Sequence, residues 1–134
     1  MGNFCQLQLR KAIYDALTAD ASLNALVAGI HDSVPAETSF PYIVLGEIQG
    51  RDWSTKTTSG ARLLITVDVY SRYLGQKEAS DIMERIKTLI HQAPLVLTGY
   101  TLVMIRYDLS DIELENDGLT YHGRMRFLAL VEDE

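Results

Sequence analysis

The sequence has little of what metal and redox proteins use. Its 134 residues include one cysteine and three histidines. A single cysteine excludes an internal disulfide and any metal site built from several cysteines. The histidines, His31, His91 and His122, are scattered, and none has a ligand partner at metal-site spacing on a common helix or strand. We therefore expect no metal and no other cofactor.

Basic charge and long apolar runs are scarce as well. Twelve Lys and Arg stand against eighteen Asp and Glu, for a net charge of -6. This balance argues against a general nucleic-acid-binding protein and against docking on anionic membranes, since both need clustered cations. No apolar run approaches the ~20 residues of a membrane span, and the start, MGNFCQLQLRK, is amphipathic rather than a signal peptide. We expect no membrane partner and synthesis in a reducing cytoplasm.

Catalytic motifs are also missing. The sequence has no glycine-rich phosphate loop, no nucleophile elbow and no paired cysteine and histidine signature. The acidic residues at 108–117 surround an expected hairpin, where a solvated edge that resists wrong pairing is a better interpretation than acid/base chemistry. We therefore expect that the protein is not an enzyme.

What is present indicates a small α+β domain over residues 1–134. Apolar residues recur at helical spacing in 4–18 and 75–92, and Asp20 can cap a short helix that Gly29 ends. Alternating or apolar strand patterns occupy 42–49 and 61–73, a short strand can follow residue 30, and Asp117-Gly118 predicts a hairpin between the last two strands. The predicted fold is a mostly antiparallel sheet of four to five strands with helices packed on one face, in the order α-α-β-β-β-α-β-β.

Within the first strand of the last predicted hairpin, the apolar residues switch from one face of the strand to the other. Pairing outward from its turn places Leu114 opposite Tyr121, but the apolar positions of the first strand then shift relative to those of the second. One extra residue near positions 110–111 reconciles them and pairs Leu109 with Met125 and Tyr107 with Phe127. We therefore predict a β-bulge there.

The polar segment 50–60 between the two long strands is the first candidate interaction surface. It is too long for a tight turn, so it forms either a flexible loop or an arm that extends the strands beyond the core. It carries Arg51, Asp52, Trp53 and Lys56, with Trp53 as the apolar anchor for a partner protein. The alternative is that Trp53 folds back on the sheet as peripheral core.

Two further candidate surfaces are single faces of elements. Phe4, Leu7 and Tyr14 gather on the side of the first helix that faces away from its apolar stripe, which suggests a subunit contact. Arg124 and Arg126 project from one face of the last strand. They suit an electrostatic contact across a subunit boundary or, equally, cross-strand pairing with neighbours such as Asp108.

The ordered phrases of the chain resemble the tail-completion or tail-terminator proteins of long-tailed phages, prophages and gene transfer agents. The matching stretches cover nearly the whole sequence: LRKAIYDALTAD, SLNALVAGIHDSVP, FPYIVLGEIQGRDWSTKTTSG, LLITVDVYSR, GQKEASDIMERIKTLIHQAPLVLTGY and DGLTYHGRMRFLALVE. FPYIVLG, RDWSTKT and the late DG-x-x-x-HG-x-x-RF pattern contribute most to the resemblance.

This resemblance implies a structural virion protein. Such proteins form a ring, typically hexameric, on the completed tail tube, stop its growth and dock to the head-side connector or stopper, and DNA passes through the lumen without sequence-specific binding. The implied partners are further copies of the chain, the tail tube protein and the connector. Two alternatives stay open: another neck or head-completion component, or a cytoplasmic small-molecule-binding α+β domain.

Overall fold

The computed structural model describes residues 2–34, 38–73 and 75–134, while the side chains of residues 2–4 lie outside the described part. The elements follow the predicted order α-α-β-β-β-α-β-β, which confirms the α+β class. Their bounds are α1 (Gly2–Thr18), α2 (Ala21–Leu26), β1 (Gly29–His31), β2 (Tyr42–Asp52), β3 (Gly60–Ser71), α3 (Lys77–Ile90), β4 (Tyr100–Leu114) and β5 (Tyr121–Asp133).

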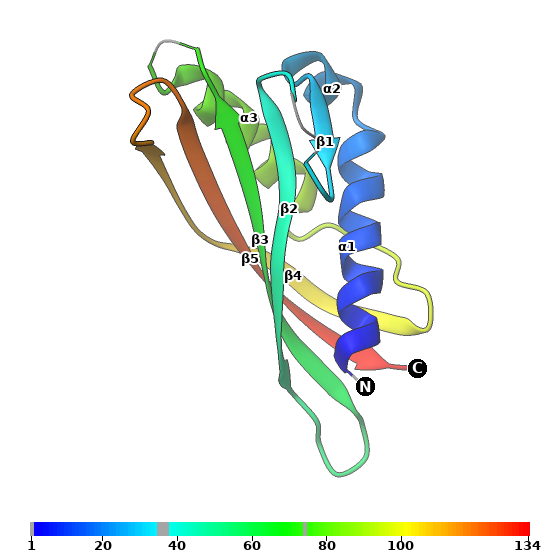
Figure 1. Cartoon of the computed structure of the whole chain (residues 1–134). Coiled ribbons are helices and arrows are strands. Elements are labelled where there is room, and N and C mark those ends of the chain that lie inside the picture. Colours follow the sequence, from blue (N-terminus) through cyan, green and yellow to red (C-terminus); the bar gives the residue numbers. More distant parts are fainter. Residues whose placement is uncertain (1, 35–37, 74) are drawn as a thin grey trace.

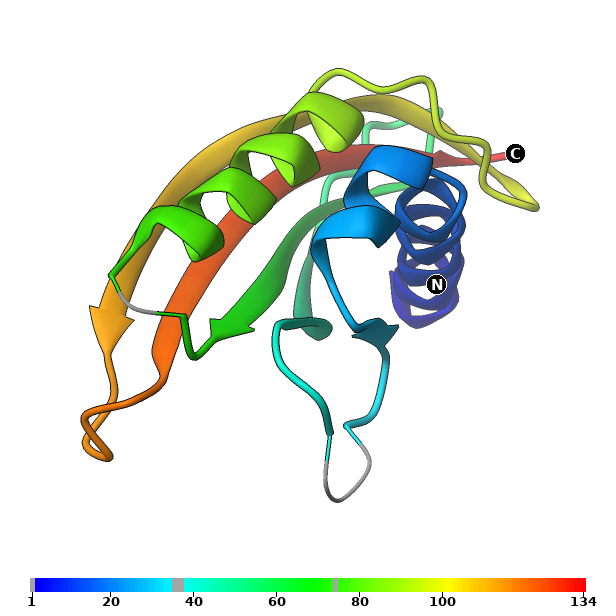
Figure 2. The ribbon, with the colours of Figure 1, turned by 90° about the horizontal axis from the view of Figure 1, so that it is seen from above.

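The strands form one five-stranded sheet in the order β1-β2-β3-β5-β4. Only the short β1 pairs in parallel, with β2, and the remaining pairs are antiparallel. The sheet is strongly twisted, and all three helices lie on one of its faces (Figure 2). β2 and β4 therefore lie on opposite sides of the central pair β3 and β5.

The core lies between the helices and the inner face of this sheet. β3 alternates as its sequence predicts: the inner side chains Leu63, Ile65, Val67 and Val69 are fully buried. From α3, Ala79, Ile82, Met83, Ile86 and Ile90 pack on this face, so the predicted apolar stripe is confirmed. From α1, the core receives Cys5, Leu9, Ala12, Ile13 and Leu17. Burial raises the pKa of the Cys5 thiol, as expected of a core residue.

Gly123 on β5 lets α3 approach the sheet. It faces Val69 across one strand boundary and Ile112 across the other. A Cβ atom built at this position would collide with the Sδ atom of buried Met83. The missing side chain is therefore the space into which Met83 packs.

α1 runs along the edge of the sheet at β2 rather than over its centre (Figure 1). The guanidinium of Arg10 donates to the carbonyl oxygens of Leu45, at 2.9 Å, and Gly46, at 2.8 Å. Gln6 donates through Nε2 to the Ile48 carbonyl at 3.1 Å. These side chains satisfy carbonyls of β2 around its register shift between Leu45 and Ile48.

The hairpin of β4 and β5 confirms part of the predicted register and corrects the rest. Leu114 pairs with Tyr121 and Tyr107 with Phe127, as predicted. The extra residue, however, is Asp108 and not 110–111, so Leu109 pairs with Arg126 and the predicted Leu109–Met125 pair is wrong.

A cross-strand ion pair accounts for the position of this bulge. Arg126 donates through Nε to the Asp108 carboxylate at 2.8 Å, which holds Asp108 in the extra place. Leu109 consequently turns to the helix-free face, where it is exposed. A second irregularity lies between Leu102 and Met104, and it leaves Val103 exposed.

Candidate assembly surfaces

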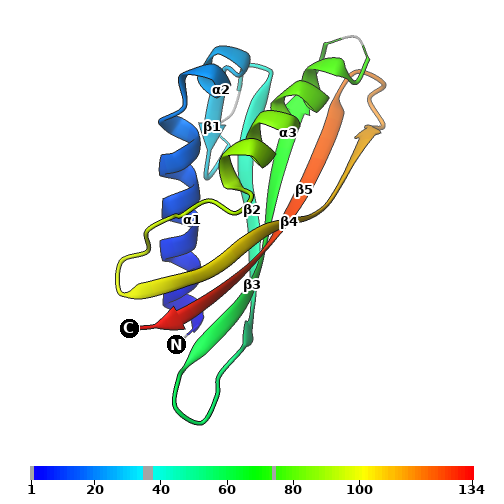
Figure 3. The same cartoon turned by 180° about the vertical axis from the view of Figure 1, so that it is seen from behind.

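The distal ends of β2 and β3 form an arm that extends past the helices (Figures 1 and 3). We define the arm as residues 50–62. Of the two sequence-based alternatives for this segment, the extended strands are observed: Arg51 pairs with Arg62, Asp52 pairs with Ala61, and the Trp53 amide donates to the Gly60 carbonyl at 2.9 Å. A turn from Thr55 to Thr58 closes the tip.

Trp53 lies at the point where the arm narrows into its tip. Its indole packs over Gly60, where a Cβ would meet the Trp53 and Val131 carbonyl oxygens at 2.8 Å. The side chain is 39 % exposed and is absent from the core cluster. Trp53 is therefore a half-covered surface aromatic, which is the kind of residue that anchors protein interfaces.

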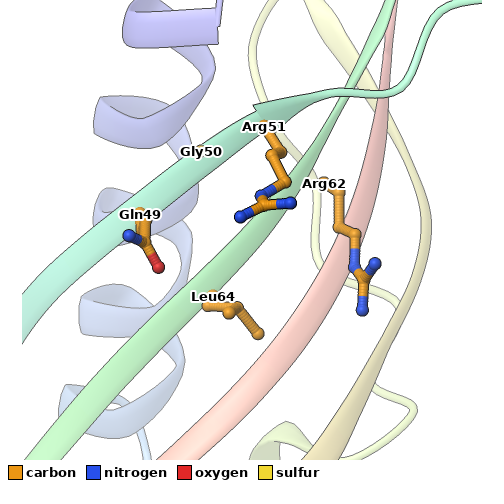
Figure 4. Close-up of a pocket in the computed structure, with 5 residues that line it drawn as sticks. All are labelled: Gln49, Gly50, Arg51, Arg62 and Leu64. Atoms are coloured by element: carbon orange, nitrogen blue, oxygen red, sulfur yellow. The ribbon is translucent and has the colours of Figure 1, made fainter.

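The arm carries cations without partners. Among the described residues, Arg51, Lys56 and Arg62 have no ion pair or hydrogen bond through their side chains, whereas most other Lys and Arg side chains do. Figure 4 shows the two guanidinium groups on the face of the sheet away from α1, beside Gln49 and Leu64. Because Arg51 and Arg62 are direct cross-strand neighbours, their like charges repel each other until an anionic group lies between them.

A second surface lies on the outer side of α1. Leu7 is 62 % exposed and Tyr14 is 38 % exposed, and both line a shallow apolar groove between α1 and β2. We call these two residues the α1 patch. Phe4, the third residue predicted for this surface, lies in α1, but its side chain is outside the described part. The α1 patch and the arm share the β2 side of the sheet.

Arg124 and Arg126 both project from β5 on the helix-free face of the sheet. Arg126 is bound to Asp108, and Nε of Arg124 lies 3.8 Å from the Asp68 carboxylate. Cross-strand pairing, the second sequence-based interpretation, is thus observed for Arg126. Both side chains keep substantial exposure, 48 % for Arg124 and 41 % for Arg126, so the subunit contact stays a proposal.

A groove between α3 and β4 was not predicted from the sequence. Its floor is apolar, with Met83, Ile112 and Met125, and its rim carries Glu84 and Lys87. The Glu84 carboxylate has no ion-pair or hydrogen-bond partner in the described part of the chain. We call this surface the α3–β4 groove. The amphipathic pattern of α3 predicts its buried stripe but not which strand lies beside it, so no local signal reveals the groove.

The helix-free face carries a row of stacked rings that sequence reasoning also missed. Tyr42 stacks on Tyr70 with centroids 5.1 Å apart, and Tyr70 stacks on His122 at 4.5 Å. His122 is buried, and its Nε2 lies 2.7 Å from the Asp68 carboxylate. Burial raises the pKa of both tyrosines. The strand register brings these residues together from three strands, which spacing along the sequence cannot reveal.

The described residues contain no group of three or more His, Cys, Asp or Glu side chains arranged to hold a metal ion. No helix in that part of the chain is long and apolar enough to cross a membrane. What the geometry offers is a set of candidate contact surfaces: the arm, the α1 patch, the arginine face of β5 and the α3–β4 groove.

Comparison with known proteins gives this geometry a context. The family model described as tail completion protein gp17 matches residues 11–132. The tail completion protein gp17 of Bacillus phage SPP1 is 27% identical over 121 residues, which is 89% of this chain and 90% of that protein. The solved structure of bacteriophage SPP1 gp17 is similar in fold, with a TM-score of 0.65, 24% identity and coverage of 90% of this chain and 86% of that chain.

A chain in the virion of a native gene transfer agent particle has a TM-score of 0.88 to this protein. The two are 26% identical, and the match covers 96% of this chain and 97% of the other. The expected resemblance to tail-completion proteins is therefore confirmed over nearly the full length. This chain belongs to the tail completion protein gp17 family and is a structural component of a virion tail.

Proposed function

We propose that this protein is a tail terminator, which closes the end of the tail tube as a ring and joins the tail to the head-side connector. The observation that supports this most is its likeness, over almost the whole of both chains, to a chain of an assembled gene transfer agent virion. The exposed contact surfaces of the isolated chain agree with a protein that works by assembly.

A closed ring of identical copies needs two different, complementary patches on each subunit. The β2 side of the sheet offers one, made of the α1 patch and the arm with Arg51, Asp52, Trp53 and Lys56. The opposite side, with β4, β5 and the arginine pair Arg124 and Arg126, offers the other. Copies that join by these patches form a ring, and we propose six of them.

The acidic balance suits a ring around DNA. A net charge of -6 disfavours adhesion of the phosphate backbone, so DNA can slide through the lumen. The tail tube and the connector are the two neighbouring protein assemblies in this proposal, one on each side of the ring.

Deletion of the gene in the producing strain tests this function. A missing terminator leaves filled heads together with free tails of abnormal length, because nothing stops polymerisation of the tube. Electron microscopy of the lysate measures the distribution of tail lengths. Tails of normal length beside leaking heads would contradict the proposal and indicate a head-completion protein instead.

A further inference from the structure

The outer edge of β4 is bonded to the rest of the chain near its middle and is open toward the hairpin. The Gln92 amide donates to the Ile105 carbonyl at 2.8 Å, and the Tyr107 amide donates to Nδ1 of His91 at 2.9 Å. Ile105 and Tyr107 therefore turn their backbone groups away from β5, as alternate residues of an antiparallel strand do. The segment after α3 satisfies this part of the edge.

Between the second register shift and the hairpin turn, the edge of β4 has no such cover. Inside the hairpin, the Glu115 amide donates to the Thr120 carbonyl at 2.8 Å. The alternate residues before it, which turn outward, are Ser110, Ile112 and Leu114. No hydrogen bond in the described part of the chain reaches their outer N–H and C=O groups. An open edge of this kind is a template for a further strand.

The outer edge of β2 is open on the arm. β1 pairs with residues 42–44, and side chains of α1 bind carbonyls within 45–48. Beyond them Gly50 and Asp52 turn outward, because the Trp53 amide donates toward β3. Among the described residues, none makes a hydrogen bond to the outer backbone groups of Gly50 and Asp52.

The strands that carry these two open edges run in opposite directions. β2, β3, β5 and β4 are each antiparallel to the next, so β2 and β4 are antiparallel as well. Copies that share one orientation around a ring axis therefore bring β4 of one copy antiparallel to β2 of the next. A contact of β4 with β4, or of β2 with β2, would be self-complementary and would close a dimer instead.

Exposed apolar side chains lie beside both edges. On the hairpin, Leu114 is 50 % exposed and Leu119 is 61 % exposed. At the β2 side, the α1 patch and Leu45 line the apolar groove. When the two edges pair antiparallel, the hairpin tip that follows Leu114 extends from the arm toward this groove. The same pairing thus brings the exposed leucines of one copy to the α1 patch of its neighbour.

We propose that β4 of one copy pairs with β2 of the next copy, so that their sheets join into one antiparallel sheet around the ring. Segments 110–114 and 49–52 form the new ladder, with Gly50 opposite Ile112 and Asp52 opposite Ser110. The hairpin tip with Leu119 packs on the α1 patch of the neighbour. The copies are staggered along the strands, as closed sheets of tilted strands are. This contact rests on the proposed ring and specifies how it closes.

Disulfide cross-linking in particles tests the pairing. In the proposed register, Arg51 lies opposite Asp111 in a pair without mutual hydrogen bonds, where two cysteines come within disulfide reach. The gene-deletion strain receives Arg51→Cys/Asp111→Cys, and purified particles are oxidised and resolved on a non-reducing gel. We expect covalent multimers up to the full ring, and only monomers from the two single variants. The reduced double variant should complement, because the contact is made between backbones.

The matched control Arg51→Cys/Arg106→Cys moves the second cysteine along the same face of β4, out of reach, and should give no multimers. Circular dichroism and thermal unfolding establish that each variant folds. Complete particles without multimers from the Asp111 pair would overturn the proposal, as would dimers from Asp111→Cys alone, which indicate a symmetric contact. A folded double variant that does not complement under reducing conditions would overturn it too.

Leu119→Asp in the background of the cysteine pair tests the hairpin tip. The multimer fraction should fall by more than about fivefold, because a carboxylate then enters an apolar contact. Val96→Asp is the control, since Val96 is 87 % exposed and lies outside the proposed contact. Equal multimer fractions in the two variants would overturn the contact of the tip with the α1 patch.

The tail lengths in the deletion strain are measured separately. Normal tails in that strain, together with multimers from the cysteine pair, would refute termination while leaving the edge pairing in place. Abnormal tails without multimers would overturn the pairing and leave termination in place.

Discussion

At the residue scale, the carboxylates of Asp20 and Asp117 both have pKa values below the usual range for aspartate. Asp20 is predicted as a helix cap, and it accepts from the Leu23 amide at 2.8 Å. It also binds Arg85 through two hydrogen bonds, and those bonds and the cap lower its pKa. Capping follows from local spacing, but a partner 65 residues away in the sequence does not.

Asp117 gives a pH-dependent prediction. Its carboxylate accepts from the Leu119 amide, the Thr120 amide and the Thr120 hydroxyl, and these bonds lower its pKa from 3.8 to about 2. A folded-state pKa below the unfolded value stabilises the fold above 3.8, and this stabilisation is lost as the pH falls toward 2. We expect the stability advantage of wild type over Asp117→Asn to shrink across that window.

Urea unfolding at a series of pH values measures this difference. Asp15→Asn serves as the control, because the Asp15 carboxylate accepts a hydrogen bond only from Lys11 within the described part of the chain. An advantage of wild type over Asp117→Asn that stays constant from pH 3.8 to 2 would show that the turn does not depend on the charged form.

At the scale of elements, periodicity predicts helices and strands well. It does not predict the positions of the β-bulges, which decide the face of the sheet on which a side chain lies. The pattern of β4 reveals that an extra residue must exist, since its apolar parity changes. Its position at Asp108 depends on the bond to Arg126, which a parity argument does not contain. The α3–β4 groove escapes prediction for a similar reason, because its two walls meet only in the folded sheet.

The attachment of α1 to the sheet edge predicts that two neighbouring cations, Arg10 and Lys11, contribute unequally to the free energy of unfolding. Arg10 satisfies two β2 carbonyls, whereas Lys11 makes an exposed pair with Asp15. Arg10→Met should lower the free energy of unfolding by about 1–2 kcal/mol, because it leaves part-buried carbonyls without donors. Lys11→Met should change it by less than about 0.5 kcal/mol. Denaturant titration compares the two, and equal losses would refute the role of Arg10.

At the scale of the whole molecule, the exposed arm residues Arg51, Trp53 and Lys56 that we propose for assembly lie outside the core that stabilises the fold. The core lies between the helices and the inner sheet face, while the arm extends beyond it (Figure 1). The sequence predicts the fold class and the element order. The strand order β1-β2-β3-β5-β4 comes only from the structure, and it is this order that places the arm and the groove on opposite edges.

Trp53→Ala should consequently separate folding from function. Because the indole lies outside the core, we expect the free energy of unfolding to fall by less than about 1 kcal/mol. We expect the yield of complete particles to fall sharply, since the interface loses its aromatic anchor. Tyr73→Ala, which removes a more exposed aromatic far from the arm, is the matched control. Outright unfolding of Trp53→Ala, or normal tails and particles, would contradict the prediction.

The end of β5 lies against the arm, where the Asp133 amide donates to the Ser59 carbonyl at 2.9 Å. The start of α1 lies at the same end of the molecule (Figure 3). A small gold-binding tag after residue 134 would therefore mark one pole of every subunit. In micrographs of intact particles, the height of the gold above the last tube layer would give the polarity of the proposed ring within the neck.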